Sequence, residues 1–272
     1  MSIQARAEAF HRLHAPGELL VLPNAWDAAS ARLMESLEAS AIATTSAGVC
    51  WAHGFADGTA IPLGVLAAAV AEIVQVTSLP VSVDIEAGYS AEPRQVAETV
   101  STLIDAGAVG INLEDGREPP ELLAAKITAV KQAAERAGVD LFVNARTDVY
   151  LVKLTRPESA LEETIARAKR YASAGCDGLF VPGLHEASAI RAVVGAVQLP
   201  LNLLVLPQLP TVAELRDCGV RRLSAGSRVF AAAFGTARRA VKQLLSEGRY
   251  ESLFSESVAY AEMNALFPKP GR

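Results

Sequence analysis

Short runs of aliphatic residues alternate along the chain with longer segments in which apolar positions recur every three or four residues. A continuous apolar run of this kind is typical of a strand buried on both faces, whereas the three-to-four spacing predicts an amphipathic helix. The runs that qualify as strands span residues 19–26, 41–46, 80–86, 110–115, 141–148, 178–183, 199–205 and 221–226. Helical spacing is clearest over residues 93–106 and 161–174. This alternation favours a parallel sheet joined by right-handed crossovers.

Glycine marks the boundary between helix and strand at three places. Gly107, Gly175 and Gly219 each stand where a helical pattern ends and a strand is about to begin. Eight such units in 272 residues predict an α/β fold, a TIM-type (β/α)8 barrel with extra N- and C-terminal helices, built as one domain over residues 1–272. An open doubly wound sheet is the alternative, although GxGxxG and Walker phosphate loops are both absent.

Beyond the last strand the pattern predicts two further helices. Residues 229–245 form the helix that follows strand eight, and about residues 250–267 form an extra amphipathic helix. The apolar stripe of the extra helix contains Phe254, Val258, Ala261 and Ala265. Such a stripe needs a surface to cover, which is either its own barrel or a neighbouring subunit.

Composition restricts the class of partner. Hydrophobic residues make up 51% of the chain and charged residues 20%, which excludes intrinsic disorder. The net charge of −5 favours neither nucleic acid nor an anionic membrane, so a small molecule is the expected partner. The N-terminus lacks the apolar core of a signal peptide, no apolar run reaches about 18 residues, and the three cysteines lack metal-ligand spacing. We therefore expect a cytoplasmic protein with reduced thiols.

Polar residues gather where three neighbouring strands end. Because side chains alternate along a strand, those on one face are Asp84 with Glu86, Asn112 with Glu114, and Asn144 with Arg146 and Asp148. Catalytic groups of a TIM barrel project from the carboxyl ends of its strands, so these carboxylates are expected to converge. Oxygen ligands without histidine or cysteine favour Mg²⁺, with Mn²⁺ as the alternative. The competing interpretation is helix caps and rim ion pairs, above all for Asp115 and Asp148.

Two loops are candidate anion sites. The backbone amides of Ala47 and Gly48, with the Ser46 hydroxyl, can form a nest for a carboxylate, although Ser-Ala-Gly is also an ordinary turn. The segment LSAGSRV over residues 223–229 follows strand eight and leads into a helix, which is a common phosphate site in barrels. The acids of strands three and four favour the first region as the main site.

Six ordered motifs carry a family resemblance. They are PNAWDAASARL (23–33), TTSAGV (44–49), ADG (56–58), LPVSVDIEAGY (79–89), AGAVGINLEDG (106–116) and NARTD (144–148). In this order the chain resembles the isocitrate lyase and phosphoenolpyruvate mutase superfamily over about residues 20–230. The resemblance implies an α/β barrel that binds Mg²⁺ and makes or breaks carbon–carbon or carbon–phosphorus bonds next to an α-keto or α-hydroxy carboxylate.

The resemblance also implies roles for individual residues. Ser46, Ala47 and Gly48 look like the family's carboxylate-binding loop, and Asp57 looks like its acid near the metal. Asp84 looks like the principal metal ligand.

Further roles follow from the later motifs. Glu86 takes the place of a more usual aspartate, and Glu114 matches the glutamate that completes the water shell of the metal. Arg146 matches the arginine that contacts the substrate or its enolate, and Asn202 matches a polar residue that reaches the far end of the substrate.

One departure from the family concerns the mobile loop after strand four. The family's lyases carry a Lys-Lys-Cys-Gly-His motif there, whose cysteine supplies a proton, whereas this chain has GREPPELLAAK over residues 116–126. Cleavage of isocitrate or methylisocitrate by the usual acid is therefore not expected. The mutase loop is not recognisable either, although Arg117 could partly replace its lysine. Pro119 and Pro120 predict a short, rigid connection into the next helix.

The expected function is a Mg²⁺-dependent lyase or decarboxylase that acts on a small α-keto, 2-hydroxy or dicarboxylic acid through a metal-stabilised enolate. Arg146, Asp57 and Glu114 are its candidate catalytic residues. Carbon–phosphorus chemistry, as a phosphonopyruvate-type mutase or hydrolase, is one alternative, and a non-catalytic α-keto-acid-binding protein is another. Because late helices of the family pack between subunits, a homodimer or homotetramer is expected.

Overall fold

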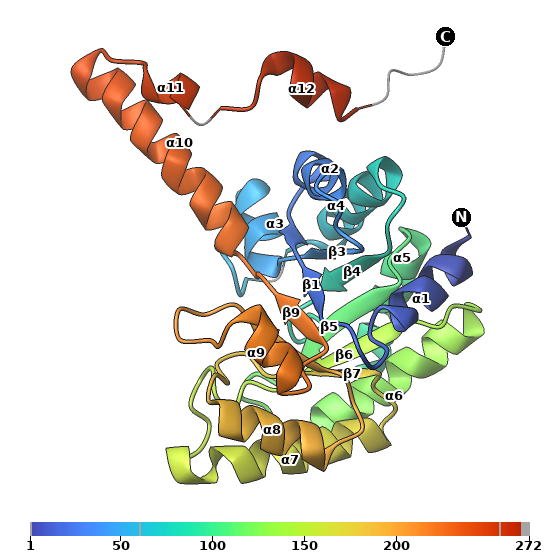
Figure 1. The fold of residues 1–272 in the computed structure, drawn as a ribbon. Helices are drawn as coiled ribbons and strands as arrows, with labels where there is room; N and C mark the ends of the chain where they lie inside the picture. Colours follow the sequence, from blue (N-terminus) through green and yellow to red (C-terminus); the bar gives the residue numbers. More distant parts are fainter. Residues whose placement is uncertain (1, 60, 256, 268–272) are drawn as a thin grey trace.

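Parallel strands form the centre of the molecule in a computed structural model that describes residues 2–59, 61–255 and 257–267. The strands are β1 (Leu20–Leu22), β2 (Asn24–Ala25), β3 (Ile42–Thr44), β4 (Val81–Asp84), β5 (Gly110–Glu114), β6 (Phe142–Arg146), β7 (Gly178–Phe180), β8 (Leu201–Leu204) and β9 (Arg222–Ser224). Each lies within a predicted run, and their order in the sheet is β1-β9-β8-β7-β6-β5-β4-β3-β2. Figure 1 shows helices around this ring. The TIM-type barrel is confirmed.

The first predicted strand is divided into two short strands, and this division closes the barrel. Leu20–Leu22 pairs with β9, whereas Asn24–Ala25 pairs with β3. Pro23 separates the two segments because proline has no N–H to donate to a neighbouring strand. Its carbonyl still accepts a hydrogen bond from the Ala43 N–H (3.2 Å). The two ends of the strand order are thus adjacent in the chain, and the sheet returns on itself.

Most of the helices cover the outside of the ring, and the rest extend it at the amino end and after β9 (Figure 1). In chain order, the described helices are α1 (Ile3–Arg12), α2 (Ala28–Ser36), α3 (Ser46–Ala52), α4 (Leu63–Val76), α5 (Pro93–Asp105), α6 (Pro120–Arg136), α7 (Pro157–Ser173), α8 (Ala187–Ala196), α9 (Val212–Asp217), α10 (Arg228–Glu247), α11 (Ser252–Ser255) and α12 (Tyr260–Ala265). The prediction over residues 93–106 is confirmed, and the one over 161–174 is extended to Pro157, because proline is tolerated in the first turn of a helix. None of the described helices is long and apolar enough to cross a membrane.

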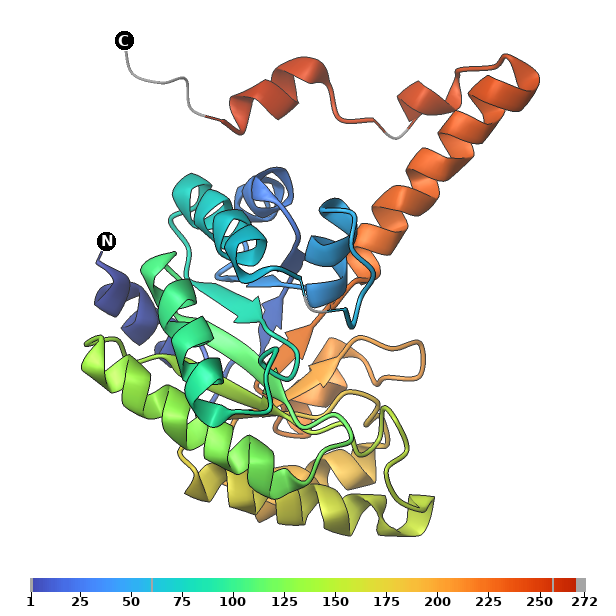
Figure 2. The same cartoon turned by 180° about the vertical axis from the view of Figure 1, so that it is seen from behind.

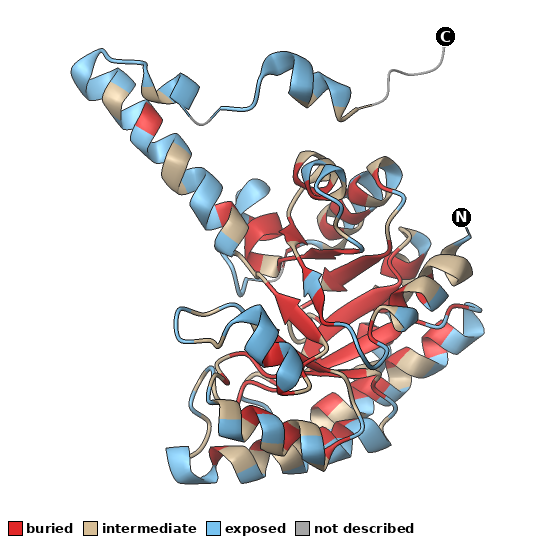
Figure 3. Cartoon of the chain, in the orientation of Figure 1, coloured by how far each residue is buried: buried red, intermediate tan, exposed pale blue. Residues whose placement is uncertain are grey.

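Burial is concentrated in the strands and on the inner faces of the helices (Figure 3). Helix α1 closes the amino end of the barrel, where the Phe10 ring lies below β5. A Cβ atom at Gly110 would lie 2.8 Å from this ring, so only glycine leaves room for it. The amino end is thereby filled, and open space remains at the carboxyl ends of the strands.

The prediction of one helix over residues 250–267 is wrong for the described part of that segment. Two short helices, α11 and α12, replace it, the described residues 257–259 between them are not helical, and Glu256 lies outside the described residues. Helix α10 runs away from the barrel, and α11 and α12 return across α2 and α4 (Figures 1 and 2). Phe254 and Val258 are exposed instead of forming part of a continuous stripe.

Candidate active site

A cavity of about 320 Å³ opens at the carboxyl ends of the strands, and its volume suits a small molecule. It is lined by Asn24, Thr45, Ser46, Ala47, Asp57, Asp84, Asn112, Arg146, Leu151, Phe180, Pro182, Leu204 and residues 224–228. The predicted site residues that share this wall are Ser46, Ala47, Asp57, Asp84 and Arg146. Gly48, Glu86, Glu114 and Asn202 do not line it.

Asp84 is the last residue of β4, and one of its two oxygens lacks a partner. Its backbone N–H donates to the Thr44 hydroxyl (2.9 Å), and the Ser46 N–H donates to Asp84 Oδ2 (3.3 Å). These contacts fix the carboxylate between β3 and α3. Asp84 Oδ1 is buried and accepts no hydrogen bond from any residue that the structure describes. Since a buried polar atom without a partner is costly, a ligand is expected at this oxygen.

Two glutamates belong to the same group of charges. Glu86 has a left-handed backbone (φ 50°), and its carbonyl accepts a hydrogen bond from the Glu114 N–H (2.9 Å). Burial raises the pKa of Glu86 to about 7, and the negative charges of Asp57 and Asp84 add to the shift. Burial also raises the pKa of Glu114 to about 8, while the positive charge of Arg146 opposes the shift. The arrangement therefore holds excess negative charge that a cation would relieve.

Arg146, at the end of β6, is held by carboxylates on two sides. Its Nε and Nη2 donate to Asp148 Oδ1 and Oδ2 (2.7 and 3.0 Å), and its Nη1 lies 2.6 Å from Glu114 Oε2. Burial disfavours the charged form, but these carboxylates outweigh burial and raise the pKa of Arg146. Because a guanidinium has five N–H donors, donors remain for a ligand in the cavity.

Asp115 and Asp148 are not helix caps. Asp148 forms the paired contact with Arg146, and its backbone N–H donates to Asp115 Oδ1 (2.9 Å). Asp115 Oδ2 accepts hydrogen bonds from Arg167 Nη1 (2.9 Å) and from the Tyr171 hydroxyl (2.6 Å). Asp115 therefore ties the end of β5 to α7 and supports the segment that carries Asp148.

The Ser-Ala-Gly segment is the first turn of α3 and not a free loop. Ser46 and Ala47 line the cavity at this turn, beside Asp84. Gly48 is buried, and a Cβ atom there would lie 2.7 Å from Thr45 Cγ2 and 3.0 Å from Trp26 Cβ. Gly48 thus allows close packing of α3 on the barrel, while Ser46 and Ala47 line the cavity.

Asn202 lies beneath the cavity, in the barrel interior. It is 1% exposed, and its Oδ1 accepts a hydrogen bond from the Ser224 hydroxyl (3.2 Å). Asn112, which strand alternation placed with Glu114 among the converging polar residues, lines the cavity, as does Asn24, which was not predicted as a site residue. Residues 224–228, considered above as a separate phosphate site, form one wall of the same cavity. The two candidate sites are therefore a single site.

The connections that follow the carboxyl ends of the strands differ in length. Residues 115–119 join β5 to α6, so the connection is short, as predicted. The longer connection is 147–156, between β6 and α7, and Arg117 Nη2 contacts the Val152 carbonyl within it (3.5 Å). Leu151 of this segment forms an apolar wall of the cavity together with Phe180, Pro182 and Leu204.

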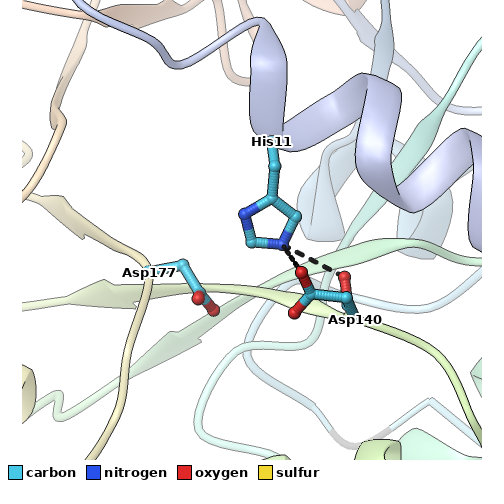
Figure 4. A group of neighbouring side chains, drawn as sticks. All are labelled: His11, Asp140 and Asp177. Carbon is cyan, nitrogen blue, oxygen red and sulfur yellow. Dashed lines mark hydrogen bonds and ion pairs between the residues drawn. The ribbon is translucent and has the colours of Figure 1, made fainter.

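A second group of potential metal ligands lies at the opposite end of the barrel. His11, Asp140 and Asp177 each offer a ligand atom, all within 4.8 Å of one another (Figure 4). Lys131 Nζ already lies 2.9 Å from Asp177 Oδ2 and 3.7 Å from Asp140 Oδ1. The ammonium group pairs with both acids, so the group is best described as an ion-pair network that joins α1 and α6 to the strand entries.

The cavity acids fit a hard divalent cation. Asp84 Oδ1 and Glu86 Oε1 are both buried, and neither accepts a hydrogen bond from a described residue. Carboxylate oxygens are the ligands that Mg²⁺ prefers, and Mg²⁺ commonly keeps several of its waters. In the described structure the carboxylate oxygens of Asp84, Glu86 and Glu114 do not all lie within 4.8 Å of one another. This spacing suits a cation that is bound partly through its waters better than one with three direct bonds to carboxylates.

Comparison with known proteins identifies the family. Residues 10–245 match the family model for phosphoenolpyruvate phosphomutase. The chain belongs to this family. The resemblance stated from the six motifs is thereby confirmed, and the chain is a member of a superfamily that contains lyases, decarboxylases and mutases.

Individual members of the family resemble the chain over most of its length. An uncharacterized protein of Mycobacterium tuberculosis (strain CDC 1551 / Oshkosh) is 40% identical over 264 residues, which cover 94% of this chain and 95% of the relative. The oxaloacetate decarboxylase of Bradyrhizobium sp. (strain BTAi1) is 32% identical, covering 75% and 72%. The crystal structure of a candidate phosphonomutase from Burkholderia cenocepacia J2315 superposes with a TM-score of 0.84 at 44% identity, covering 89% and 99%.

Proposed function

We propose that this family member is a Mg²⁺-dependent lyase or decarboxylase that cleaves a carbon–carbon bond next to the carboxylate of a small α-keto or 2-hydroxy acid. The supporting observation is one cavity that combines a carboxylate with a partnerless buried oxygen, Asp84, and an arginine with unused donors, Arg146. An anionic substrate needs the N–H donors of Arg146, and a bound cation would be the missing partner of the Asp84 oxygen.

The residues that would hold Mg²⁺ are Asp84, with Glu86 and Glu114 through its waters. When bound, the cation would supply positive charge to the carboxylate and 2-oxo oxygens of a keto acid. Mn²⁺ has similar ligand preferences and is the alternative cation.

The chain's own residues bind and orient the substrate. The unused N–H donors of Arg146 would bind a carboxylate or the oxygen that becomes negatively charged on bond cleavage. Because Asp148 and Glu114 hold the guanidinium in place, this donor is oriented before the substrate arrives. Ser46 and Ala47 would bind the other carboxylate oxygen, and Asp57, on the exposed connection after α3, is the candidate acid near the opening.

The apolar wall favours carbon–carbon over carbon–phosphorus chemistry. Leu151, Phe180 and Pro182 would keep water away from a carbon centre. A phosphonate dianion needs several cations, whereas the described arginines of the cavity are Arg146, already paired with two carboxylates, and Arg228, which is exposed.

The test is a panel of α-keto and 2-hydroxy acids with Mg²⁺, in which release of pyruvate, CO₂ and phosphate is followed separately. We expect pyruvate or CO₂ from at least one small acid, and no activity in Asp84→Ala. Phosphate release from phosphonopyruvate would favour the mutase or hydrolase alternative. Tight keto-acid binding without any product would identify a non-catalytic binding protein.

We also propose that the chain forms a homodimer or homotetramer. Helix α10 leaves the barrel, and Phe234, Leu245 and Phe254 on the described C-terminal segment are largely exposed. A depression of about 630 Å³ lies outside β1, where Val21 is 52% exposed. An exposed apolar arm and an uncovered strand face are surfaces that a second copy would bury.

A further inference from the structure

The barrel interior contains a buried arginine without a carboxylate partner. Arg222, on β9, is fully buried, its described hydrogen bonds go to the neutral side chains of Asn112 and Ser224, and its Nη1 has no partner among the described residues. Burial lowers its pKa to about 9, while the negative charge of Asp84 opposes the shift, so the charge is kept at neutral pH. Its guanidinium carbon lies 6.0 Å from the centre of the Phe10 ring, below the cavity. A buried charge of this kind is costly, and apolar residues of similar volume are often tolerated in its place.

The hydrogen bonds of Arg222 set the orientation of a neighbouring amide. Arg222 Nη2 donates to Asn112 Oδ1 (3.3 Å), and Asn144 Nδ2 donates to the same oxygen (2.9 Å). Because a guanidinium has no acceptor, Asn112 must present its oxygen to Arg222 and its amide nitrogen to the other side. Without the arginine, the two ends of this amide would be interchangeable.

The same arginine orients a second pair of side chains. Arg222 Nε donates to the Ser224 hydroxyl oxygen (3.3 Å), and the Ser224 hydroxyl donates to Asn202 Oδ1 (3.2 Å). With its oxygen accepting from Arg222, the Ser224 hydroxyl keeps its one hydrogen for Asn202. One buried cation thus lies at the centre of hydrogen bonds that link β5, β6, β8 and β9, and it sets the direction of those at Asn112 and Ser224.

The consequence for the cavity lies at Asn112. Asn112 lines the cavity, and it is the register partner of Asp84 on the adjacent strand. With its oxygen turned to Arg222 and Asn144, its Nδ2 donates to none of the described residues and is the donor left for the cavity. An N–H donor beside Asp84 suits an anionic oxygen of a substrate.

We propose that Arg222 is a positioning residue that holds the Asn112 amide with Nδ2 toward the cavity, so that Asn112 binds a carboxylate or enolate oxygen of the substrate. The proposal rests on the proposed function, because it takes the cavity as the binding site of a keto acid. It assigns the binding contact to Asn112 and the orienting contact to Arg222.

The main experiment is calorimetry of oxalate binding to the full chain in the presence of Mg²⁺, because oxalate has the paired oxygens of a keto acid or its enolate. Arg222→Met should weaken binding by at least about tenfold. Arg222→Lys keeps a donor toward Asn112 and should be less affected. Arg221→Met is the matched control, since Arg221 adjoins Arg222 on the chain and its Nη1 donates to the Val220 carbonyl (3.4 Å). Its affinity should equal that of the wild type.

Thermal unfolding separates positioning from a structural role. Arg222→Met should melt at the wild-type temperature or above it, because the substitution removes a buried unpaired charge. A large fall in melting temperature with unchanged oxalate affinity would show a purely structural arginine and overturn the proposal. Wild-type affinity in a well-folded Arg222→Met protein would overturn it as well.

A double-substitution cycle tests the Arg222–Asn112 contact without any ligand. Asn112→Asp should lower the melting temperature more in the Arg222→Met background than in the wild type, because only the wild type pairs the new carboxylate with a cation. Equal effects in both backgrounds would overturn the orienting contact. If the wild type fails to bind oxalate with Mg²⁺, the proposed function is refuted, and this cycle still decides whether Arg222 orients Asn112.

Discussion

Raising the pH of the metal-free protein from about pH 6.5 to about pH 8.5 should destabilise it, because the folded state keeps a proton on Glu114 that the unfolded chain releases. Burial raises the pKa of Glu114 from 4.5 to about 8, with Asp84, Asp148 and Glu86 adding to the shift and Arg146 opposing it. Because the folded pKa is the higher one, the contribution is lost as the pH rises through about 8.

The size of this loss in stability follows from the part of the Glu114 pKa shift that lies inside the pH range of the experiment. Between about pH 6.5 and the pKa near 8, roughly 1.5 units at 1.36 kcal/mol each give about 2 kcal/mol. For a chain of this length that corresponds to roughly 4–8 °C in melting temperature. Glu86, with its pKa raised to about 7 chiefly by burial, adds a smaller contribution of the same sign because it is partly exposed to solvent. His14, with its pKa lowered to about 3 by burial, is neutral in the folded state, and the loss of its proton from the unfolded chain above pH 6.5 opposes the trend slightly.

Differential scanning calorimetry at several pH values, with and without Mg²⁺, measures this directly. Mg²⁺ should stabilise the protein more at the higher pH, because it binds the deprotonated carboxylates of the folded state. Glu114→Gln is the matched control, since an amide cannot ionise and most of the pH trend should disappear. A melting temperature that is constant or rises with pH in the metal-free wild type would refute the reasoning, as would an unchanged slope in Glu114→Gln.

Three further predictions concern the site and the assembly. Asp84→Ala should abolish Mg²⁺-dependent oxalate binding in calorimetry, and unchanged affinity would place the metal elsewhere. Arg146→Lys should slow turnover strongly, because lysine cannot reproduce the paired bonds to Asp148; a rate within about threefold of wild type, roughly 0.6 kcal/mol, would exclude Arg146 from the mechanism. Truncation after Gly248 should lower the oligomeric state in light scattering, whereas a full-length mass near 28.6 kDa would contradict the oligomer.

The local pattern of apolar residues was sufficient to predict the strands of the barrel. Each strand lies inside an apolar run, because parallel strands buried on both faces need continuous aliphatic residues. The prediction of one C-terminal helix was wrong because it depended on more than the local pattern. Apolar spacing over residues 250–267 satisfies a helical pattern, but spacing does not reveal whether a surface is present to support one long helix, and α11 and α12 are short and largely exposed.

Strand alternation also predicted that Asp84 and Arg146 would face the same end of the barrel, and they line one cavity. The sequence by itself determined these local facts: which runs are strands, which side chains share a face, and which carboxylates stand at strand ends.

Only the tertiary structure decided which of these groups are partners. Asp115 and Asp148 have the same place at the end of a strand, yet one bonds Arg167 and Tyr171 of a distant helix while the other holds Arg146. The contact of Arg222 with Asn112 spans 110 residues and arises because the closed barrel brings β9 and β5 to face each other across its interior. Periodicity depends on neighbours along the chain, whereas the charge, burial and hydrogen bonding of a site depend on neighbours across the barrel.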